Sequence, residues 1–364
     1  MSGTRTSDRA PSIRDVALAA GVSYQTVSRV LNDHPRIRPS TAERVHAAIG
    51  QLGYRPNRAA RALVTSRSHT IGVLITARSL HGPFSSFVAI EQAARERGYA
   101  ISATPNTSED ADGIAWALDG LLSRGVDGIV AIAPQDAARA VIRRIASRVP
   151  LIALQGGPDE ADSLSVDQQD GARAATRHLI ELGHRRILHL PGPEGWAEAA
   201  ERRKGYLAEM AQHGLDPLLG PAADWTPDGG YAAGRAVLPI DGARRSGDDF
   251  SAVFSANDEM AIGFVAAARE AGIRVPQDLS VVGFDDIPTA RYATPPLTTV
   301  RQDFTGIGRQ AIATLIDAID QVEPAEAAPV RPFELIVRES TAAAHHDLVA
   351  TRDPGLTAAG GARV

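Results

Sequence analysis

Residues 12–32 read SIRDVALAAGVSYQTVSRVLN, and this stretch predicts two short helices joined by a tight turn. Ser12 is followed three residues later by Asp15, a pattern that caps a helix N-terminus. Apolar residues then recur at helical spacing, and Gly21 stands where a left-handed backbone commonly ends a helix. Ser23 is placed to cap the second helix. The spacing therefore predicts a helix-turn-helix.

The second helix has polar side chains on the face opposite its apolar residues Val27, Val30 and Leu31. Gln offers a bidentate pair of hydrogen bonds to adenine and Arg offers one to guanine, while Ser and Tyr reach phosphates. An ordinary helical hairpin with a solvated polar face is the alternative. We expect a DNA-reading surface, made of Ser23, Tyr24, Gln25, Thr26, Ser28 and Arg29.

A third helix is predicted from the sequence Ser40-Thr41-Ala42-Glu43, which has the form of a capping box, to Gly53. Pro56 then breaks the chain, and Asn57 is placed to cap one further short helix. Because a helix of about two turns is marginal alone in water, we expect it to form only against a partner. That property suits a switch element.

The charge is distributed unevenly along the 364 residues, a length that suits two or three compact units. Residues 1–67 carry 11 Arg and 4 acidic residues, a net charge of +7, whereas the remainder has a net charge of −12. A basic head on an acidic body is typical of a protein whose head contacts DNA.

Composition also excludes several classes of site. There is no Cys, which excludes disulfides, thiolate metal sites and cysteine nucleophiles. Residues 1–11 lack a hydrophobic signal region, and no apolar run is long enough to span a bilayer. We therefore expect a cytoplasmic protein without membrane contact, cofactor or metal.

From residue 69 onward, short apolar runs alternate with helical segments, which predicts an α/β protein with two doubly wound parallel sheets and a cleft between two lobes. The expected strands are 70–75, 99–103, 127–133, 150–154, 186–190, 252–255, 280–284 and 297–300. The expected helices are 84–97, 110–124, 136–147, 168–182, 198–213 and 258–271.

Polar residues follow several of these strands, where ligands bind in open parallel sheets. Asn257 and Asp258 follow one strand, Asp285 and Asp286 another, and Gln302 a third. Such side chains, with a tryptophan for stacking, favour a sugar. We expect Asp258 to cap the following helix. A general acid–base pair of the two adjacent carboxylates is the less favoured interpretation.

The positions of the histidines indicate no catalytic role for them. His178, His184 and His189 are predicted to lie at helix ends or on the surface. No Ser/His/Asp arrangement is evident either.

On these residues, above all the run from Gly21 to Val30, the sequence resembles the lactose repressor family of bacterial transcription regulators. The resemblance extends from about residue 13 to about residue 340. It implies that Tyr24, Gln25 and Arg29 contact operator bases. It also implies that Leu63 enters the central minor groove from a hinge helix, a device that kinks DNA. A plain contact between domains is the alternative for Leu63. The implied DNA-binding set further includes Tyr54, Asn57 and Ala60.

The resemblance implies a body like the periplasmic sugar-binding proteins, crossed three times by the chain. The domains expected from it are a disordered N-terminus 1–11, the DNA-binding domain 12–56, a hinge helix and linker 57–68, an effector-binding core 69–343 and a disordered tail 344–364. Within the core, the N-terminal lobe (N-lobe) comprises 69–166 and 301–328, and the C-terminal lobe (C-lobe) comprises 167–300 and 329–343.

The effector site implied by the resemblance comprises His81, Pro83, Phe87, Gln155, Trp196, Arg202, Trp225, Asn257, Asp285 and Gln302. The sequence departs from the family's type member at Gln155, which replaces an aspartate, and at Trp196 and Glu198, which replace small residues. A galactoside is therefore one candidate among neutral sugars.

These features predict a homodimeric repressor of sugar-utilisation genes that binds a pseudopalindromic operator in double-stranded DNA and is released by a sugar. A corepressor-dependent regulator with a non-sugar effector stays open, as do a sugar-binding or a sugar-phosphorylating protein with a DNA-binding head. The last lacks the phosphate-loop pattern G-x-x-x-x-G-K-[ST]. Residues 341–364 contain no leucine heptads, so a dimer is expected.

Overall fold

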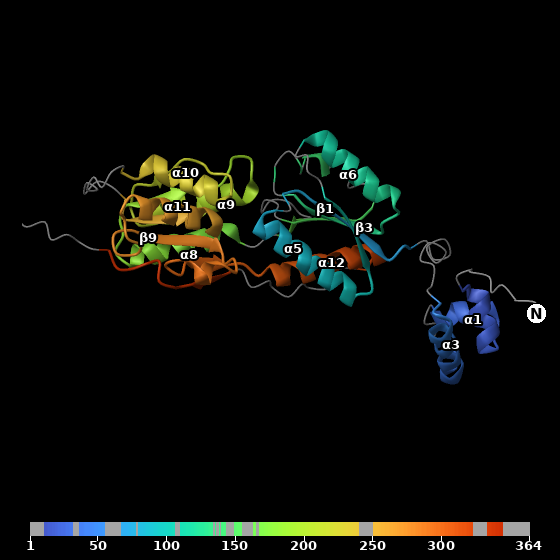
Figure 1. The fold of residues 1–364 in the computed structure, drawn as a ribbon. Coiled ribbons are helices and arrows are strands. Elements are labelled where there is room, and N and C mark those ends of the chain that lie inside the picture. Colours follow the sequence, from blue (N-terminus) through green and yellow to red (C-terminus); the bar gives the residue numbers. More distant parts are fainter. Residues whose placement is uncertain are drawn as a thin grey trace, which may run out of the picture. The chain divides into compact units, whose positions relative to one another are not determined.

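The computed structural model describes residues 11–31, 36–54, 67–77, 79–105, 110–133, 135, 138, 140–142, 149–154, 163–164, 167–239, 250–322 and 333–344. The chain divides into two units, the first ending at His69 and the second beginning at Thr70 (Figure 1). Predicted site residues that lie outside the described part are Asn57, Ala60, Leu63 and Gln155.

The first unit, the head, contains α1 (Ile13–Ala20), α2 (Tyr24–Leu31) and α3 (Pro39–Leu52). The predicted cap of α1 is confirmed, because the Ser12 hydroxyl accepts from the Asp15 N–H at 3.4 Å and the Ser12 N–H donates to the Asp15 carboxylate at 2.7 Å. Gly21 has a φ of 64°, as the turn requires. One small core joins the three helices, formed by Val16, Ala17, Ala20, Val27, Val30, Val45 and Ala48.

The predicted capping box of α3 is wrong. The helix begins at Pro39, and its N-cap residue Arg38 makes no side-chain capping hydrogen bond. Proline has the φ of a helix and lacks the N–H that would go unpaired at its first position. The helix therefore begins one residue before Ser40, which lies inside the first turn.

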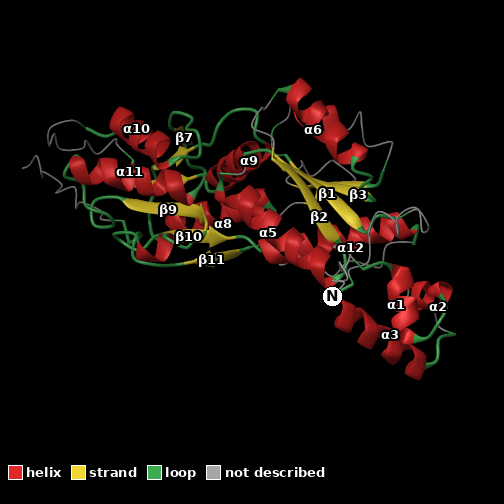
Figure 2. Cartoon of the chain, turned by 45° about the vertical axis from the view of Figure 1, so that its right-hand side comes forward, coloured by secondary structure: helices red, strands yellow, loops and turns green. Residues whose placement is uncertain are grey.

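The N-lobe is built on a parallel sheet with the strand order β2-β1-β3-β4-β5, and its strands β1, β2 and β3 are labelled in Figure 2. Its strands are β1 (Thr70–Ile75), β2 (Ala100–Pro105), β3 (Gly128–Ile132), β4 (Leu151–Leu154) and β5 (Ser163–Leu164). Ile71, Val73 and Ile75 pack against α5 (His81–Glu96) and α12 (Phe304–Asp320), whereas Leu74 packs against α6 (Ala111–Ser123). Both faces are covered, which is why β1 is a continuous apolar run.

The C-lobe sheet has the strand order β11-β10-β9-β8-β6-β7. Its strands are β6 (Ile187–Leu190), β7 (Leu218–Leu219), β8 (Ala252–Ser255), β9 (Ser280–Asp285), β10 (Thr298–Arg301) and β11 (Glu334–Ile336). The core on one face includes α8 (Gln168–Glu181) and α9 (Ala197–Gln212), and the core on the other includes α10 (Pro227–Val237) and α11 (Asp258–Glu270). A short 3-10 helix spans Ala290–Tyr292.

The predicted fold class, a helix-turn-helix head followed by two α/β lobes, is confirmed, with one correction to the sheets. Strand β11 pairs antiparallel with β10, so the second sheet is not wholly parallel. β10 ends at Arg301 where the chain leaves for α12, and β11 begins after α12, where the chain returns. Because the chain leaves β10 and enters β11 at the same edge of the sheet, these two neighbouring strands run in opposite directions.

The predicted placement of His189 at the surface or at a helix end is wrong. His189 lies within β6, is fully buried, and is stacked between Tyr206 and Phe254 with ring centroids 5.0 and 4.9 Å away. Burial lowers its pKa to about 4. His184 follows α8 as expected but is also buried, and its Nδ1 lies 2.8 Å from the Ser251 hydroxyl.

No helix in the described ranges combines the length and the apolar character needed to cross a membrane.

Candidate functional site

The head exposes one polar face of α2. Val27 and Val30 hold the helix against the head core, and Tyr24, 56 % exposed, lies on the outer side with Gln25 and Arg29. At the N-terminus of the helix the Ser23 hydroxyl accepts from the Thr26 N–H at 3.1 Å. The exposed donors therefore project from a helix that is anchored by its opposite face, as a major-groove reader requires.

Two further predicted DNA contacts differ in exposure. Ser28 is half-buried on α2. Tyr54 directly follows α3 and packs against the head core, and its burial raises the pKa of its phenol. Tyr54 is thus held in place by the head itself.

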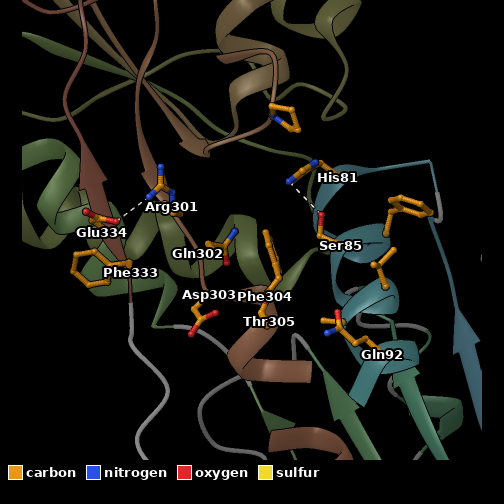
Figure 3. Close-up of a pocket in the computed structure, with 14 residues that line it drawn as sticks. His81, Ser85, Gln92, Arg301, Gln302, Asp303, Phe304, Thr305, Phe333 and Glu334 are labelled. Atoms are coloured by element: carbon orange, nitrogen blue, oxygen red, sulfur yellow. Dashed lines mark hydrogen bonds and ion pairs between the residues drawn. The ribbon is translucent and has the colours of Figure 1, made fainter. Parts of the chain in front are cut away.

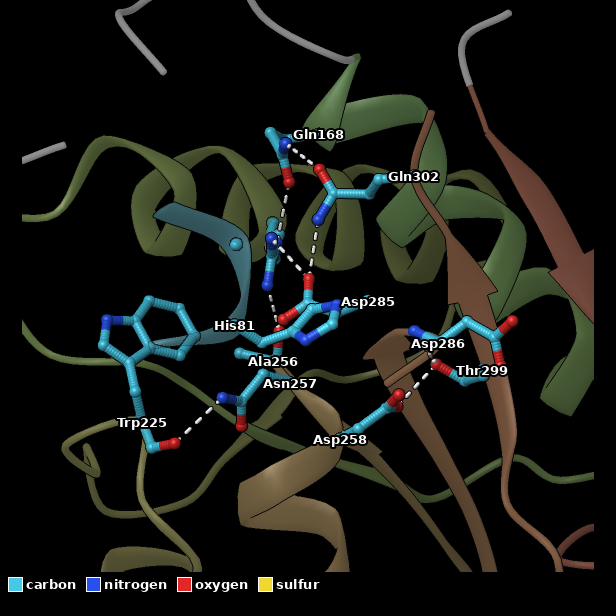
Figure 4. Close-up of polar contacts among 12 residues, drawn as sticks. His81, Gln168, Trp225, Ala256, Asn257, Asp258, Asp285, Asp286, Thr299 and Gln302 are labelled. Atoms are coloured by element: carbon cyan, nitrogen blue, oxygen red, sulfur yellow. Dashed lines mark hydrogen bonds and ion pairs between the residues drawn. The ribbon is translucent and has the colours of Figure 1, made fainter. Parts of the chain in front are cut away.

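In the second unit, the side chains of Gln168, Gln302, Asp285 and Arg202 close a hydrogen-bonded ring, and Figure 4 labels the first three of them. Arg202 donates from Nε to Gln168 at 2.8 Å and from Nη2 to the Asp285 carboxylate at 3.2 Å. Gln302 donates to the same Asp285 oxygen at 2.6 Å and accepts from Gln168 at 2.7 Å. A further bond runs from Arg202 to the Ala256 carbonyl.

The guanidinium of Arg202 lies over two aromatic rings. Its central carbon lies 3.9 Å from the Phe284 ring centroid and 5.5 Å from that of Trp225. Arg202 is 3 % exposed and Asp285 is 9 % exposed. Burial raises the pKa of Asp285, and the positive charge of Arg202 opposes that rise. The ring is therefore a preorganised set of donors and acceptors with nearly compensated charge.

Sequence reasoning missed Gln168. It is the first residue of α8 and lies directly after a predicted crossing between the lobes. That position beside the cleft is the signal that identifies it.

The predicted cap role of Asp258 is wrong, because its neighbour performs it. The Asn257 side chain accepts from the Met260 N–H at 2.9 Å as the N-cap of α11, and its amide donates to the Trp225 carbonyl at 2.9 Å. Asp258 is fully buried, accepts from the Ile287 N–H at 2.9 Å and accepts from the Thr299 hydroxyl. Desolvation raises its pKa well above the ordinary value.

Eight of the ten predicted effector residues line one small cleft between the lobes, together with Leu80, Gly82 and Glu198. They are His81, Pro83, Trp196, Arg202, Trp225, Asn257, Asp285 and Gln302. The cleft encloses only about 30 Å³, comparable to the space of one water molecule. Phe87 is placed elsewhere, packed against the N-lobe core.

A larger cavity of about 930 Å³ adjoins the cleft and shares His81 and Gln302 with it (Figure 3). Its walls come from α5, from the chain crossings at residues 301–305 and 333–334, and from Pro288. Its charged groups are paired or used in capping: Arg301 bonds Glu334 at 3.1 Å, and Asp303 caps α12.

An ion-pair network joins the two chain crossings on the C-lobe side. Asp286 accepts from Arg301 at 2.7 Å and from Arg338 at 2.5 Å. These cations hold the pKa of Asp286 below its ordinary value, although burial alone would raise it. Asp286 therefore holds the two crossings together through ion pairs.

No cluster of three or more potential metal ligands is present in the ranges that the structure describes.

Comparison with known proteins matches both units. Residues 12–57 match the model of bacterial regulatory proteins of the lacI family, and residues 176–341 match a periplasmic binding protein-like domain. The chain is 32% identical over 331 residues to the lactose operon repressor of Escherichia coli (strain K12), covering 90% of each chain.

Two solved structures are similar over most of the chain. A lac repressor dimer bound to operator and the anti-inducer ONPF has a TM-score of 0.80 at 30% identity, covering 92% of this chain and 100% of that one. A complex of the transcriptional regulator CelR with cellobiose has a TM-score of 0.64 at 31% identity, covering 91% of this chain and 99% of that one.

Proposed function

Because this chain belongs to the lacI family of bacterial regulatory proteins, we propose that a neutral sugar held between its lobes controls the binding of its head to operator DNA. The chain is a DNA-binding transcriptional regulator with an effector-binding domain. Repression relieved by the sugar is the form of control that we propose. The regulated genes would then be those for using that sugar.

The observation that carries this proposal is the ring of Arg202, Gln168, Gln302 and Asp285. It combines fixed donors and acceptors with an adjacent aromatic ring, Trp225, which is the combination that sugar hydroxyls and sugar faces require. Since Asp285 nearly compensates the charge of Arg202, the site does not demand an anion. The cellobiose in the CelR complex supports a neutral ligand here.

We propose the following roles for the predicted residues. Tyr24, Gln25 and Arg29 read bases, and Ser23, Thr26, Ser28 and Tyr54 contact the backbone of the duplex. Arg202, Asp285 and Gln302 bind sugar hydroxyls, and His81, Pro83, Asn257 and Trp196 complete the cleft. Roles at Asn57, Ala60, Leu63 and Gln155 stay predictions, because these residues lie outside the described part.

We propose that the protein acts as a homodimer, as in the dimeric lac repressor complex with operator. Two heads related by two-fold symmetry would then read a pseudopalindrome. A sugar that changes the angle between the lobes alters the spacing of the two heads, and operator affinity falls. Coupling of this kind is reciprocal, so operator DNA weakens sugar binding by the same factor.

The test is fluorescence anisotropy of a labelled operator, selected from random duplexes by the protein itself, in the presence of neutral sugars. We expect one sugar to weaken operator binding, and Arg202→Ala to abolish that response while operator binding persists. Arg203→Ala is the matched control, because Arg203 is the exposed neighbour on α9. A sugar that strengthens operator binding would establish the corepressor form instead. No preference for any two-fold symmetric duplex would overturn the proposal.

A further inference from the structure

The cleft as it stands is too small for any sugar, although its polar ring is complete. It encloses about 30 Å³, whereas ligand sites commonly enclose about 300 to 1,000 Å³. The space beside the ring must therefore widen before an effector contacts it.

Trp196 occupies the place beside Trp225. The two indole rings pack edge to face, with centroids 5.7 Å apart and planes inclined by 67°. Arg202 lies over the Trp225 ring at 5.5 Å. Trp225 is only 4 % exposed in this packing, to which Gly192 also contributes, so a sugar ring cannot stack on it in this arrangement.

The backbone of Trp196 is also tied to the opposite lobe. Gln135, which follows β3 of the N-lobe, forms an isolated antiparallel bridge with Trp196 at the start of α9 in the C-lobe. Gln135 is 7 % exposed, and its side-chain oxygen accepts from the Thr76 hydroxyl at 2.6 Å, directly after β1. Trp196 thus contributes its side chain to the cleft and its backbone to the contact between the lobes.

Among the described residues that line the cleft, one buried polar atom has no hydrogen-bond partner. The indole N–H of Trp225 is buried without a hydrogen-bond partner among the described residues. Burial of an unpaired donor is unfavourable. A rearrangement that opens the space around Trp225 therefore relieves a penalty already present in the closed state.

From these observations we propose that Trp196 is a plug, held by the Gln135 bridge, that a neutral sugar must displace to reach Trp225. The inference rests on the proposed function and specifies which residue selects the effector. A ligand must offer enough hydroxyls and ring face to replace the Trp196–Trp225 contact. Only molecules in which Trp196 has moved away can bind the sugar, so the apparent affinity is reduced in proportion to their fraction. Trp196 thereby excludes ligands that bind too weakly to displace it.

The sequence allows a direct spectroscopic test, because it contains only three tryptophans. The third, Trp116 on α6, is 74 % exposed, and Trp116→Phe removes its signal from the emission spectrum. In that background the full-length protein is titrated with cellobiose, glucose and ribose, and binding is measured in parallel by calorimetry.

We expect the sugar that binds to shift the emission to longer wavelength as Trp196 moves from Trp225 into water. Trp196→Ala should bind the same sugar about 2- to 12-fold more tightly, the equivalent of one aromatic pair, and should lose most of the shift. Gln135→Leu keeps the backbone groups of the bridge but removes the side-chain acceptor through which Thr76 positions Gln135, so the bridge to Trp196 is held less firmly. The Thr76 hydroxyl keeps the Ile132 carbonyl as a partner at 3.4 Å. That variant should bind more tightly while retaining the shift.

The outcomes separate the two proposals. Tighter binding by wild type than by both variants would mean that Trp196 is a wall of the sugar site, and the plug would be refuted while the proposed function stands. A sugar that binds without any change in emission would refute the plug as well. If none of a wide panel of neutral sugars binds wild type or either variant, both proposals fail.

Discussion

Arg202→Ala tests whether the buried ring in the cleft is an electrostatic unit. The substitution removes the donor to Gln168, Ala256 and Asp285 and leaves the Asp285 carboxylate 9 % exposed without its cation. Removing one partner of a buried pair costs about 3–5 kcal/mol. We expect a loss of that size in the free energy of unfolding at pH 8.

The loss should depend on pH in a defined direction. Burial already raises the pKa of Asp285, and Arg202 is the strongest influence opposing that rise. Without Arg202 the pKa in the folded state rises further above its unfolded value. Folding then binds a proton in the window between the two values, so stability falls as the pH rises through it. The penalty should consequently be smaller at pH 5.5 than at pH 8.

Urea unfolding at both pH values measures this, with Arg203→Ala as the control. An exposed substitution away from such contacts changes stability by no more than about 0.5 kcal/mol. The double variant Arg202→Met with Asp285→Leu should recover most of the loss, because no unpaired charge is left buried. A loss for Arg202→Ala no larger than that of the control, or one that grows as the pH falls, would refute the reasoning.

Three further predictions concern separate sites. Because the pKa of His189 falls from 6.5 to about 4 in the fold, stability should drop as the pH falls from 7 to 4, by about 3 kcal/mol from this group at 1.36 kcal/mol per unit; urea unfolding of His189→Phe should show a shallower slope. Gln25→Ala and Arg29→Ala should each weaken operator binding about 5- to 150-fold without lowering the melting temperature, since both are exposed. Gly283→Ala should destabilise by about 1–3 kcal/mol in a thermal melt, because its Cβ would lie 2.1 Å from the Asp258 carboxylate; an unchanged melt would contradict that packing.

Much of the fold is readable from the sequence because its strands are short apolar runs bounded by turns. The strand 70–75 and the strand 252–255 were predicted with the bounds that the structure has. α10 was not predicted, because it contains glycines, which ordinarily disfavour a helix. At Gly230 a Cβ would lie 2.1 Å from the Met260 carbonyl oxygen of α11. The glycines there permit close helix packing, which only the tertiary structure reveals.

In the cleft, too, some features follow from the local sequence and others depend on tertiary contacts. Residue types after strand ends identified Asp285 and Gln302 as neighbours of one cleft, because parallel strands end at one edge of a sheet, whereas Arg202, which lies within α9, was assigned to it by the family resemblance. Asn257 and Asp258 are adjacent and chemically similar, and the prediction chose Asp258 as the cap of α11 although Asn257 performs that role. The decision depends on Thr299 and Ile287, which reach Asp258 from distant segments. His189 was misplaced for the same reason, since its stacking partners come from α9 and β8.

The covering of the N-lobe sheet has a consequence for synthesis on the ribosome. Ile307, Ile312 and Leu315 of α12 belong to the same core as Ile71 of β1, although most of the C-lobe separates them along the chain. A nascent chain acquires its N-terminal parts first, so the head completes its own core early. One apolar face of the N-lobe sheet stays partly uncovered until residue 320 has left the exit tunnel. Chaperones therefore have their longest opportunity to bind that face during synthesis.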